Sequence, residues 1–191
     1  MEALDALLNR VSVPRLTAPA PDAAQRELLF RAALRAPDHG QLRPWRFLTI
    51  EGAGLTALGE LFAATLLAEQ PDAKAEALAK ARAMPMRAPL LVAVIARLQA
   101  HAKVPQQEQI LAAGCAAHGL LLAAHAQGLG AVWRTGELSH SRAVAAGLGL
   151  VSTWVRRRAS CAPRCCSIPR TSSAPGPWLN APRPAVVAGK R

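Results

Sequence analysis

Residues 107–127 are apolar on nearly every side, and this stretch constrains the fold more than any other part of the chain. A helix that is apolar all round belongs in the middle of a protein or in a membrane. The best membrane candidate, residues 110–128, is interrupted by two histidines and a glutamine, whereas a spanning helix needs ~18 apolar residues in a row. The stretch therefore predicts a central core helix, and we expect no membrane partner.

Helix and strand patterns alternate around this central helix. The i, i+3, i+4 spacing of apolar residues predicts an opening helix with Leu4, Leu7 and Leu8 on one face, and a third helix containing Leu55 to Leu66. Between them, a helix capped by Asp22 is expected to end before Pro37. An exposed helix is expected from Asp72, and a last helix capped by Ser139 or Ser141 is expected to end near Leu148. Short apolar runs predict strands at Trp45–Ile50, Pro89–Ile95 and Ala131–Trp133. The pattern indicates a mixed domain of helices and strands, with a sheet between helices.

The net charge of +11 is concentrated at one end of the chain. Residues 1–150 contain 15 basic and 12 acidic residues, whereas residues 151–191 contain 8 basic residues and no acidic one. The second segment also holds six of the 15 prolines and three of the four cysteines. We therefore expect a folded domain over 1–150 and a basic, disordered tail over 151–191.

The tail suggests two functions that its own composition argues against. Its charge could contact phosphates, but Trp154 and Trp178 are too sparse to form a stacking surface. Cys161, Cys165 and Cys166 lack the second pair of ligands that a structural zinc site needs. We therefore expect neither nucleic acid as a partner nor a metal, although nucleic-acid binding stays a lesser alternative.

The familiar catalytic arrangements are absent from residues 1–150. The Gly-Leu-Gly of 128–130 precedes a strand and lacks a third glycine, so it is not a dinucleotide fingerprint. His118 and His125 would lie about 10 Å apart along a helix, too far to share a metal. Cys115 is most simply a small core residue. The acidic first five residues are unlike a secretory signal and favour a cytoplasmic protein.

Three segments at the ends of predicted elements carry arginine and hydrogen-bonding side chains: 9–12, 35–45 and 130–136. A guanidinium and a nearby hydroxyl can share one phosphate through charge-assisted hydrogen bonds. Each segment also has a plainer interpretation, as a solvated arginine or as a helix-to-strand connector. Together, they suggest one shared anionic ligand.

The order of these motifs resembles the nitroreductase family of flavin enzymes, in particular its compact NAD(P)H-dependent members. The resemblance spans about residues 1–150 and rests on Arg10-x-Ser12, then Arg-Ala-Pro-Asp-His at 35–39 with Pro44-Trp45, then Lys103-Val-Pro with Glu108-Gln109, then Ala-Gln-Gly-Leu-Gly at 126–130 with Trp-Arg-Thr-Gly at 133–136. It implies an α+β fold with a central mixed sheet between helices, and a homodimer that binds FMN at the subunit interface.

The resemblance also implies roles for particular residues. Arg10 and Ser12 would hold the phosphate and ribityl end of FMN, although Val11 replaces a second arginine that is common in the family. Arg35 and His39 would close over the cofactor from the partner chain. Trp133, Arg134 and Thr135 would line the flavin pocket. The segment assigned to the nicotinamide nucleotide would be Ala123, Ala124, His125, Ala126, Gln127 and Gly128.

The implied activity explains why no side chain is assigned a catalytic role, since a flavin supplies the redox chemistry itself. Hydride would pass from NADH or NADPH to the flavin, and a nitroaromatic, a quinone or a similar small molecule would then accept the electrons. The alternative is a relative that binds flavin without turnover. Oxidation of NADH or NADPH with a quinone would separate the two.

The resemblance ends near Leu150, where the family has an apolar strand. This chain continues with Arg-, Pro-, Ser- and Cys-rich sequence, as if a GC-rich gene were translated in a shifted frame. We therefore expect the last core strand to be missing. Loss of three or four large core side chains at ~1.5–3 kcal/mol each would remove much of a domain's stability. The chain is then expected to fold, dimerise and hold FMN poorly.

Overall fold

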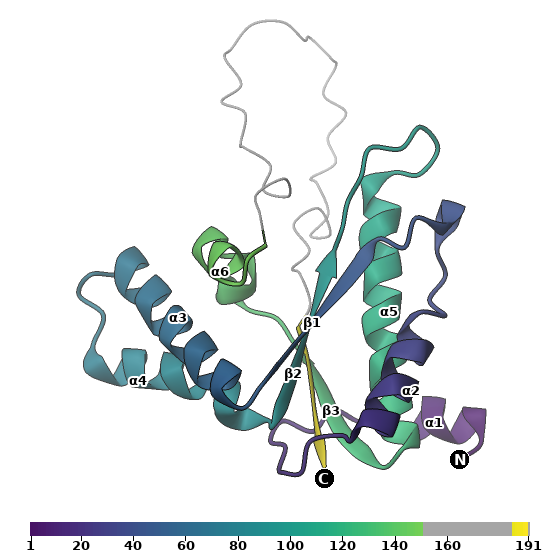
Figure 1. The fold of residues 1–191 in the computed structure, drawn as a ribbon, viewed down its shortest axis with the longest axis horizontal. Helices are drawn as coiled ribbons and strands as arrows, with labels where there is room; N and C mark the ends of the chain where they lie inside the picture. The colour runs from purple at the N-terminus through teal and green to yellow at the C-terminus, as the bar shows by residue number, and fades with distance from the viewer. Residues whose placement is uncertain (151–184, 191) are drawn as a thin grey trace, which may run out of the picture.

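The computed structural model describes residues 1–150 and 185–190, which form a four-stranded sheet between two layers of helices (Figure 1). The helices are α1 (Ala3–Asn9), α2 (Ala23–Ala33), α3 (Ala53–Glu69), α4 (Ala75–Ala83), α5 (Gln106–Ala126) and α6 (Arg142–Gly147), and the strands are β1 (Trp45–Glu51), β2 (Leu90–Ala96), β3 (Leu129–Arg134) and β4 (Ala185–Lys190). α1, α2 and α5 lie on one side of the sheet, and α3, α4 and α6 lie on the other. This layering confirms the predicted α+β class.

The strand order is β1-β2-β4-β3, and each neighbouring pair is antiparallel. The expectation of a mixed sheet is therefore wrong in this respect. The reason lies between β1 and β2, where α3 and α4 pack together as a helical hairpin that returns the chain to the end it left. β2 then starts opposite the end of β1, with Leu90 paired to Glu51.

β4 contradicts the expectation that no core strand follows residue 150. It pairs with β2 through Leu90↔Ala188 and with β3 through Ala131↔Ala188. The prediction relied on the absence of alternation, but a strand between two neighbours and two helical layers needs none. The short apolar run 185–188 was therefore enough. The cysteine cluster at Cys161, Cys165 and Cys166 and the predicted disorder of residues 151–184 lie outside the described residues.

α5 is the buried central helix that the sequence predicts. Its buried residues are Gln109, Ala112, Ala113, Ala116, Ala117, Leu120, Leu121, Ala124 and His125. The apolar ones, from Ala112 to Ala124, form the largest core cluster together with Leu29 and Ala33 of α2 and with residues from β1, β2 and β3. Within the described residues, α5 is the one helix long and apolar enough to cross a membrane, and half of its apolar window is buried inside the protein.

Cys115 is exposed, so its interpretation as a core residue is wrong. It shares the outward face of α5 with Leu111 and His118, which are also exposed and lie four and three residues away. A helix that covers a sheet turns only part of its surface toward it, even when its composition is apolar all round.

The opposite face of the sheet carries a smaller core. Ile50 of β1 packs with Leu55 and Leu58 of α3 in a cluster of three buried residues. α3 and α4 approach very closely at Gly59, where a Cβ would overlap the backbone carbonyl oxygen of Arg82. Glycine is therefore required there for the two helices to pack.

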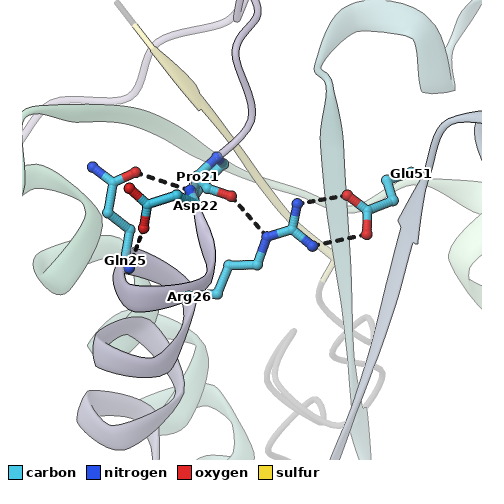
Figure 2. A network of polar contacts seen from close by, with 5 residues as sticks. All are labelled: Pro21, Asp22, Gln25, Arg26 and Glu51. Atoms are coloured by element: carbon cyan, nitrogen blue, oxygen red, sulfur yellow. Dashed lines mark hydrogen bonds and ion pairs between the residues drawn. The ribbon is translucent and has the colours of Figure 1, made fainter.

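The predicted cap of α2 is confirmed and belongs to a larger polar network (Figure 2). The Asp22 carboxylate accepts from the Gln25 N–H at 2.8 Å, and the Gln25 side chain accepts from the Asp22 N–H at 3.0 Å. Arg26 donates two hydrogen bonds to Glu51, at 2.8 and 2.6 Å, and a third to the Pro21 carbonyl. The network ties the start of α2 to the end of β1. The Arg26 guanidinium lowers the pKa of the Glu51 carboxyl.

Two other predicted helix starts differ from the structure. The fourth helix begins at Ala75 rather than at Asp72. Ser141 precedes α6, as predicted, but makes no side-chain cap. Its hydroxyl instead donates to Glu69 of α3 at 3.3 Å, which joins the ends of the two helices.

Candidate functional site

The segment after α1 lies along β3, so the first and third predicted site segments are neighbours. The Val13 N–H donates to the Ala131 carbonyl at 3.0 Å. Arg134 donates from Nη2 to the Pro14 carbonyl at 3.2 Å. Arg10 is half-buried at the end of α1 and Ser12 is exposed. Two hydrogen bonds therefore connect the chain next to Ser12 with the strand that carries Trp133.

Trp133 and Arg134 occupy opposite faces of β3, because successive side chains of a strand alternate. The Trp133 ring lies over α5, where its Cη2 atom would be 3.6 Å from a Cβ at Gly114. Val132, on the face of Arg134, packs with Leu16 and Ala88 away from α5. Trp133 therefore belongs to the α5 side, together with Leu129 and Ala131, which are part of the α5 core. Thr135, just past the strand, is exposed.

The second predicted segment, 35–45, is a tight loop anchored to α5. His39 Nδ1 lies 2.6 Å from the Glu108 carboxylate in the first turn of that helix. The Arg43 N–H donates to the Asp38 carboxylate at 2.6 Å, and Arg43 adopts a positive φ of 46°. The sequence marks His39 and Glu108 as separate motifs, but their pairing depends on the fold. Arg35 is exposed beside this loop.

α5 thus supports two of the predicted site residues. His39 is bonded to Glu108, and Trp133 lies against Gly114. These two positions are six residues apart, about 9 Å along the helix axis. α1, which is followed directly by Arg10, also packs against α5.

The segment predicted for the nicotinamide nucleotide, 123–128, lies at the other end of α5. Ala124 and His125 are buried, Ala123 and Gln127 are half-buried, and Ala126 and Gly128 are exposed. Gln127 donates from Nε2 to the Ala123 carbonyl at 3.1 Å. Since the length of α5 separates this segment from Glu108, one chain does not bring it to His39.

A pocket of about 360 Å³ opens beside β3, lined by Val13, Pro14, Arg15, Arg87 and Arg134. Arg134 was expected at the site, whereas sequence reasoning missed Arg15 and Arg87. Neither arginine stands in a recognisable motif, so only the fold reveals that they are neighbours. Within residues 1–150 and 185–190, no group of three His, Cys, Asp or Glu residues is placed to hold a metal ion.

Comparison with known proteins identifies a family. The model of the nitroreductase family matches residues 7–155. The Escherichia coli K12 protein named "Putative NAD(P)H nitroreductase YdjA" is 42% identical over 149 residues, which cover 78% of this chain and 80% of that protein.

Two crystal structures have the same fold. A nitroreductase-like family protein from Bacillus cereus has a TM-score of 0.70 at 18% identity, covering 100% of this chain and 86% of the other. A nitroreductase-type protein from Desulfovibrio desulfuricans, crystallised in complex with FMN, has a TM-score of 0.61 at 25% identity, covering 97% and 84%.

Proposed function

The chain belongs to the nitroreductase family, and from this premise we propose that it is an FMN-dependent oxidoreductase that oxidises NADH or NADPH and reduces a small acceptor such as a nitroaromatic or a quinone. The observation that carries the proposal is the pair of hydrogen bonds by which Val13 and Pro14 join β3, the strand whose Trp133 ring lies over α5. We place this activity in the cytoplasm, where reduced nicotinamide nucleotides are available.

The residues present fit FMN. A half-buried Arg10 and a nearby hydroxyl at Ser12 suit a phosphate. The Trp133 side chain, 36% exposed, offers an aromatic surface on the strand to which Val13 and Pro14 are bonded. Trp133, Arg134 and Thr135 would hold the flavin through the end of β3, and residues 123–128 would contact the nicotinamide nucleotide.

The chain's own task in such an enzyme is to bind and orient. When bound, FMN supplies two-electron chemistry between the reduced nicotinamide and the acceptor. Arg10 would neutralise the phosphate. The hydrogen bond between His39 and Glu108 would fix the imidazole at the start of α5, and Trp133 would exclude water from one side of the site.

We further propose that the chain works as a homodimer. α1 has no buried residue, and its Leu4, Leu7 and Leu8 are 69%, 55% and 79% exposed. Leu111, on the outward face of the adjacent α5, is 62% exposed. An apolar face of this kind on a short helix is typical of a surface that a second copy covers. The second copy would also bring its own Arg35 and His39 to the site.

The decisive experiment is to purify the full chain, add FMN, remove unbound flavin and quantify the flavin released on denaturation. We expect about one FMN per chain, with NADPH or NADH oxidation in the presence of a quinone. Arg10→Gln should lower FMN retention at least about tenfold and leave riboflavin binding unchanged, because only the phosphate contact is lost. Arg31→Gln, an exposed arginine at the end of α2, is the control.

Two results would contradict the proposal. A protein that retains no flavin, although circular dichroism shows it to be folded, is not an FMN enzyme. A protein that retains FMN but oxidises neither nucleotide with any quinone or nitro compound would instead be the flavin-binding relative without turnover.

The dimer is tested separately by sedimentation of the full chain. Leu7→Glu with Leu8→Glu should convert a dimer into a monomer, because two charges would enter an apolar interface. Glu2→Gln, at the exposed start of α1, is the matched control. A monomeric wild-type chain would exclude the dimer.

A further inference from the structure

The contact between His39 and Glu108 determines which nitrogen of the imidazole is available for chemistry. Nδ1 of His39 lies 2.6 Å from a Glu108 carboxylate oxygen. Among the ion-pair contacts within residues 1–150, this is the one that contains a histidine. Because an ionised carboxylate can only accept a hydrogen bond, Nδ1 carries the proton of the neutral ring. The contact therefore leaves Nε2 as the nitrogen that takes up and gives back a proton.

His39 is open to solvent, unlike two other histidines of the described residues. Nδ1 of His101 accepts two backbone hydrogen bonds within its own loop, and His125 is buried in α5. By contrast, the side chains of His39 and Glu108 are 58% and 47% exposed. Water and a small molecule can therefore both reach the His39 ring.

The first turn of α5 holds Glu108 in place through the neighbouring residue Gln109, which is 1% exposed. The Gln109 amide donates to the carbonyls of Gln99 and Val104, at 2.9 and 3.2 Å. Its oxygen accepts from the Gln99 N–H at 2.9 Å. A buried amide with partners on both its oxygen and its nitrogen keeps one orientation. The turn that carries Glu108 is therefore fixed to the segment 99–104.

The loop that carries His39 is fixed to the same segment. A Cβ at Gly40 would lie 3.2 Å from a Val104 methyl carbon, so the loop packs closely against this residue. The carbonyl of Leu42 accepts from Nε2 of Gln99 at 3.4 Å. Both members of the pair are thus positioned before a substrate arrives, which reduces the cost of orienting them in a reaction.

We propose that His39 and Glu108 form a proton-donating pair for the electron acceptor, with His39 as the donor and Glu108 as its positioning residue. The proposal rests on the proposed function, in which the reduced nicotinamide supplies a hydride. A quinone that becomes a hydroquinone takes up this hydride and one proton. The new O–H bond forms as the N–H bond at Nε2 of the protonated ring breaks. The ring becomes neutral, and water then returns a proton to Nε2.

Glu108 has two tasks in this transfer. Its carboxylate faces the positive ring before the proton leaves, and it keeps the hydrogen bond from Nδ1 afterwards, so the ring does not turn between cycles. Both residues belong to one chain. In the proposed homodimer, the pair would therefore enter the site of the second copy as a unit.

The pairing is tested first without flavin, by nitrogen NMR of the full chain with labelled histidine at mildly alkaline pH. The His39 signals, identified by their loss in His39→Gln, should show a protonated Nδ1 and an unprotonated Nε2. Glu108→Ala should abolish this preference. Glu76→Ala, which removes the acidic residue from the first turn of α4, is the matched control and should preserve it. A wild-type ring protonated at Nε2, or the same tautomer in Glu108→Ala, would overturn the proposal.

The proton transfer is tested by comparing two acceptors with FMN-loaded protein. A quinone needs a proton, whereas ferricyanide takes single electrons without forming a bond to hydrogen. His39→Gln should lower kcat/KM for the quinone at least about tenfold more than kcat/KM for ferricyanide, and Glu108→Ala should act in the same direction. Weaker FMN binding would lower both values alike, so their ratio isolates the proton. Equal losses with the two acceptors would overturn the proposal.

Failure of the proposed function gives a different result. A wild type that oxidises neither nucleotide with either acceptor would contradict the proposed function and the proton transfer together, whereas the NMR measurement would still report the pairing. A wild type that reduces both acceptors, with an unchanged ratio in His39→Gln, would remove the proton donor and leave the proposed function intact.

Discussion

The two faces of the sheet differ in the size of their buried cores and in the functional side chains that they carry. On the α5 face, fifteen buried residues form one cluster, and His39 and Trp133 lie against the same helix. On the α3 face, the cores under α3 and beside β3 each have three buried residues, and the arginine pocket opens there. The α5 face thus combines stability with the proposed flavin site, whereas the α3 face has charged groups on a lighter core.

The first prediction tests whether both faces of the sheet depend on β4, the strand between β2 and β3. Deletion of residues 185–191 leaves β2 and β3 without the partner that joins them. We expect the loss to exceed about 5 kcal/mol, comparable to the whole stability of a small domain. Urea unfolding followed by circular dichroism measures it. An unchanged midpoint would mean that the sheet does not need β4 and would restore the expectation of a missing strand.

The second prediction compares the two cores with one substitution on each face. Leu120 of α5 and Leu58 of α3 are 2% and 6% exposed. Leu120→Ala should cost about 3–5 kcal/mol, because the large cluster cannot collapse around the cavity, and Leu58→Ala about 2 kcal/mol. Urea midpoints of the two variants provide the measurement. A larger loss at Leu58 would reverse the ranking of the two faces.

The third prediction compares two glycines at helix–helix contacts: Gly59, where α3 meets α4, and Gly119, where α5 meets α2. At Gly59 a Cβ would overlap the Arg82 carbonyl, whereas at Gly119 it would lie 3.1 Å from the Ala32 carbonyl. Gly59→Ala should therefore cost about 1–3 kcal/mol by forcing α3 from α4. Gly119→Ala should stay within about 1 kcal/mol of the wild type, since the helix propensity of alanine offsets a slight shift. Thermal unfolding compares the two, and equal losses would contradict the difference in packing.

The smallest effect is expected at the ion pair that links α2 with β1. Because Arg26 lowers the pKa of Glu51 from 4.5, the pair stabilises the fold above pH ~4.5 and loses this contribution as the pH falls through the lowered pKa. Both side chains are partly exposed, so Arg26→Gln should cost no more than about 1 kcal/mol at pH 7. The difference from wild type should shrink below pH 4 and in high salt. If the wild type and Arg26→Gln differed in stability by the same amount at pH 7 and pH 3, the ion pair with Glu51 would not be the cause of the difference.

The sequence predicts those parts of the fold whose signals are local. Asp22 with Gln25 marks the start of α2, and apolar spacing marks α3 and α5. β4 was missed because its place in the sheet depends on pairing with β2 and β3, which lie more than fifty residues earlier. Cys115 was misplaced because composition does not reveal which side of an apolar helix faces outward.

The candidate site is predictable to a similar extent. Motif order predicts Arg10, His39 and Trp133 as site residues, which stays a prediction, but it does not reveal that His39 bonds with Glu108. Arg15 and Arg87 carry no sequence signal, since the hydrogen bond that joins Leu16 to Arg87 spans more than seventy residues. Charge counts alone would place them among solvated arginines.

β3 separates the aromatic side chain of Trp133, which faces α5, from the pocket that Arg134 lines on the opposite face of the sheet. The alternation of side chains along the strand determines which residue points to which face. Inserting a single amino acid into β3 before Trp133 would turn the Trp133 indole toward the arginines of the pocket and the Arg134 guanidinium toward Gly114. An evolutionary lineage can lengthen the loops at either end of this strand freely. Within the strand, only insertions or deletions of an even number of residues keep Trp133 and Arg134 on their present faces.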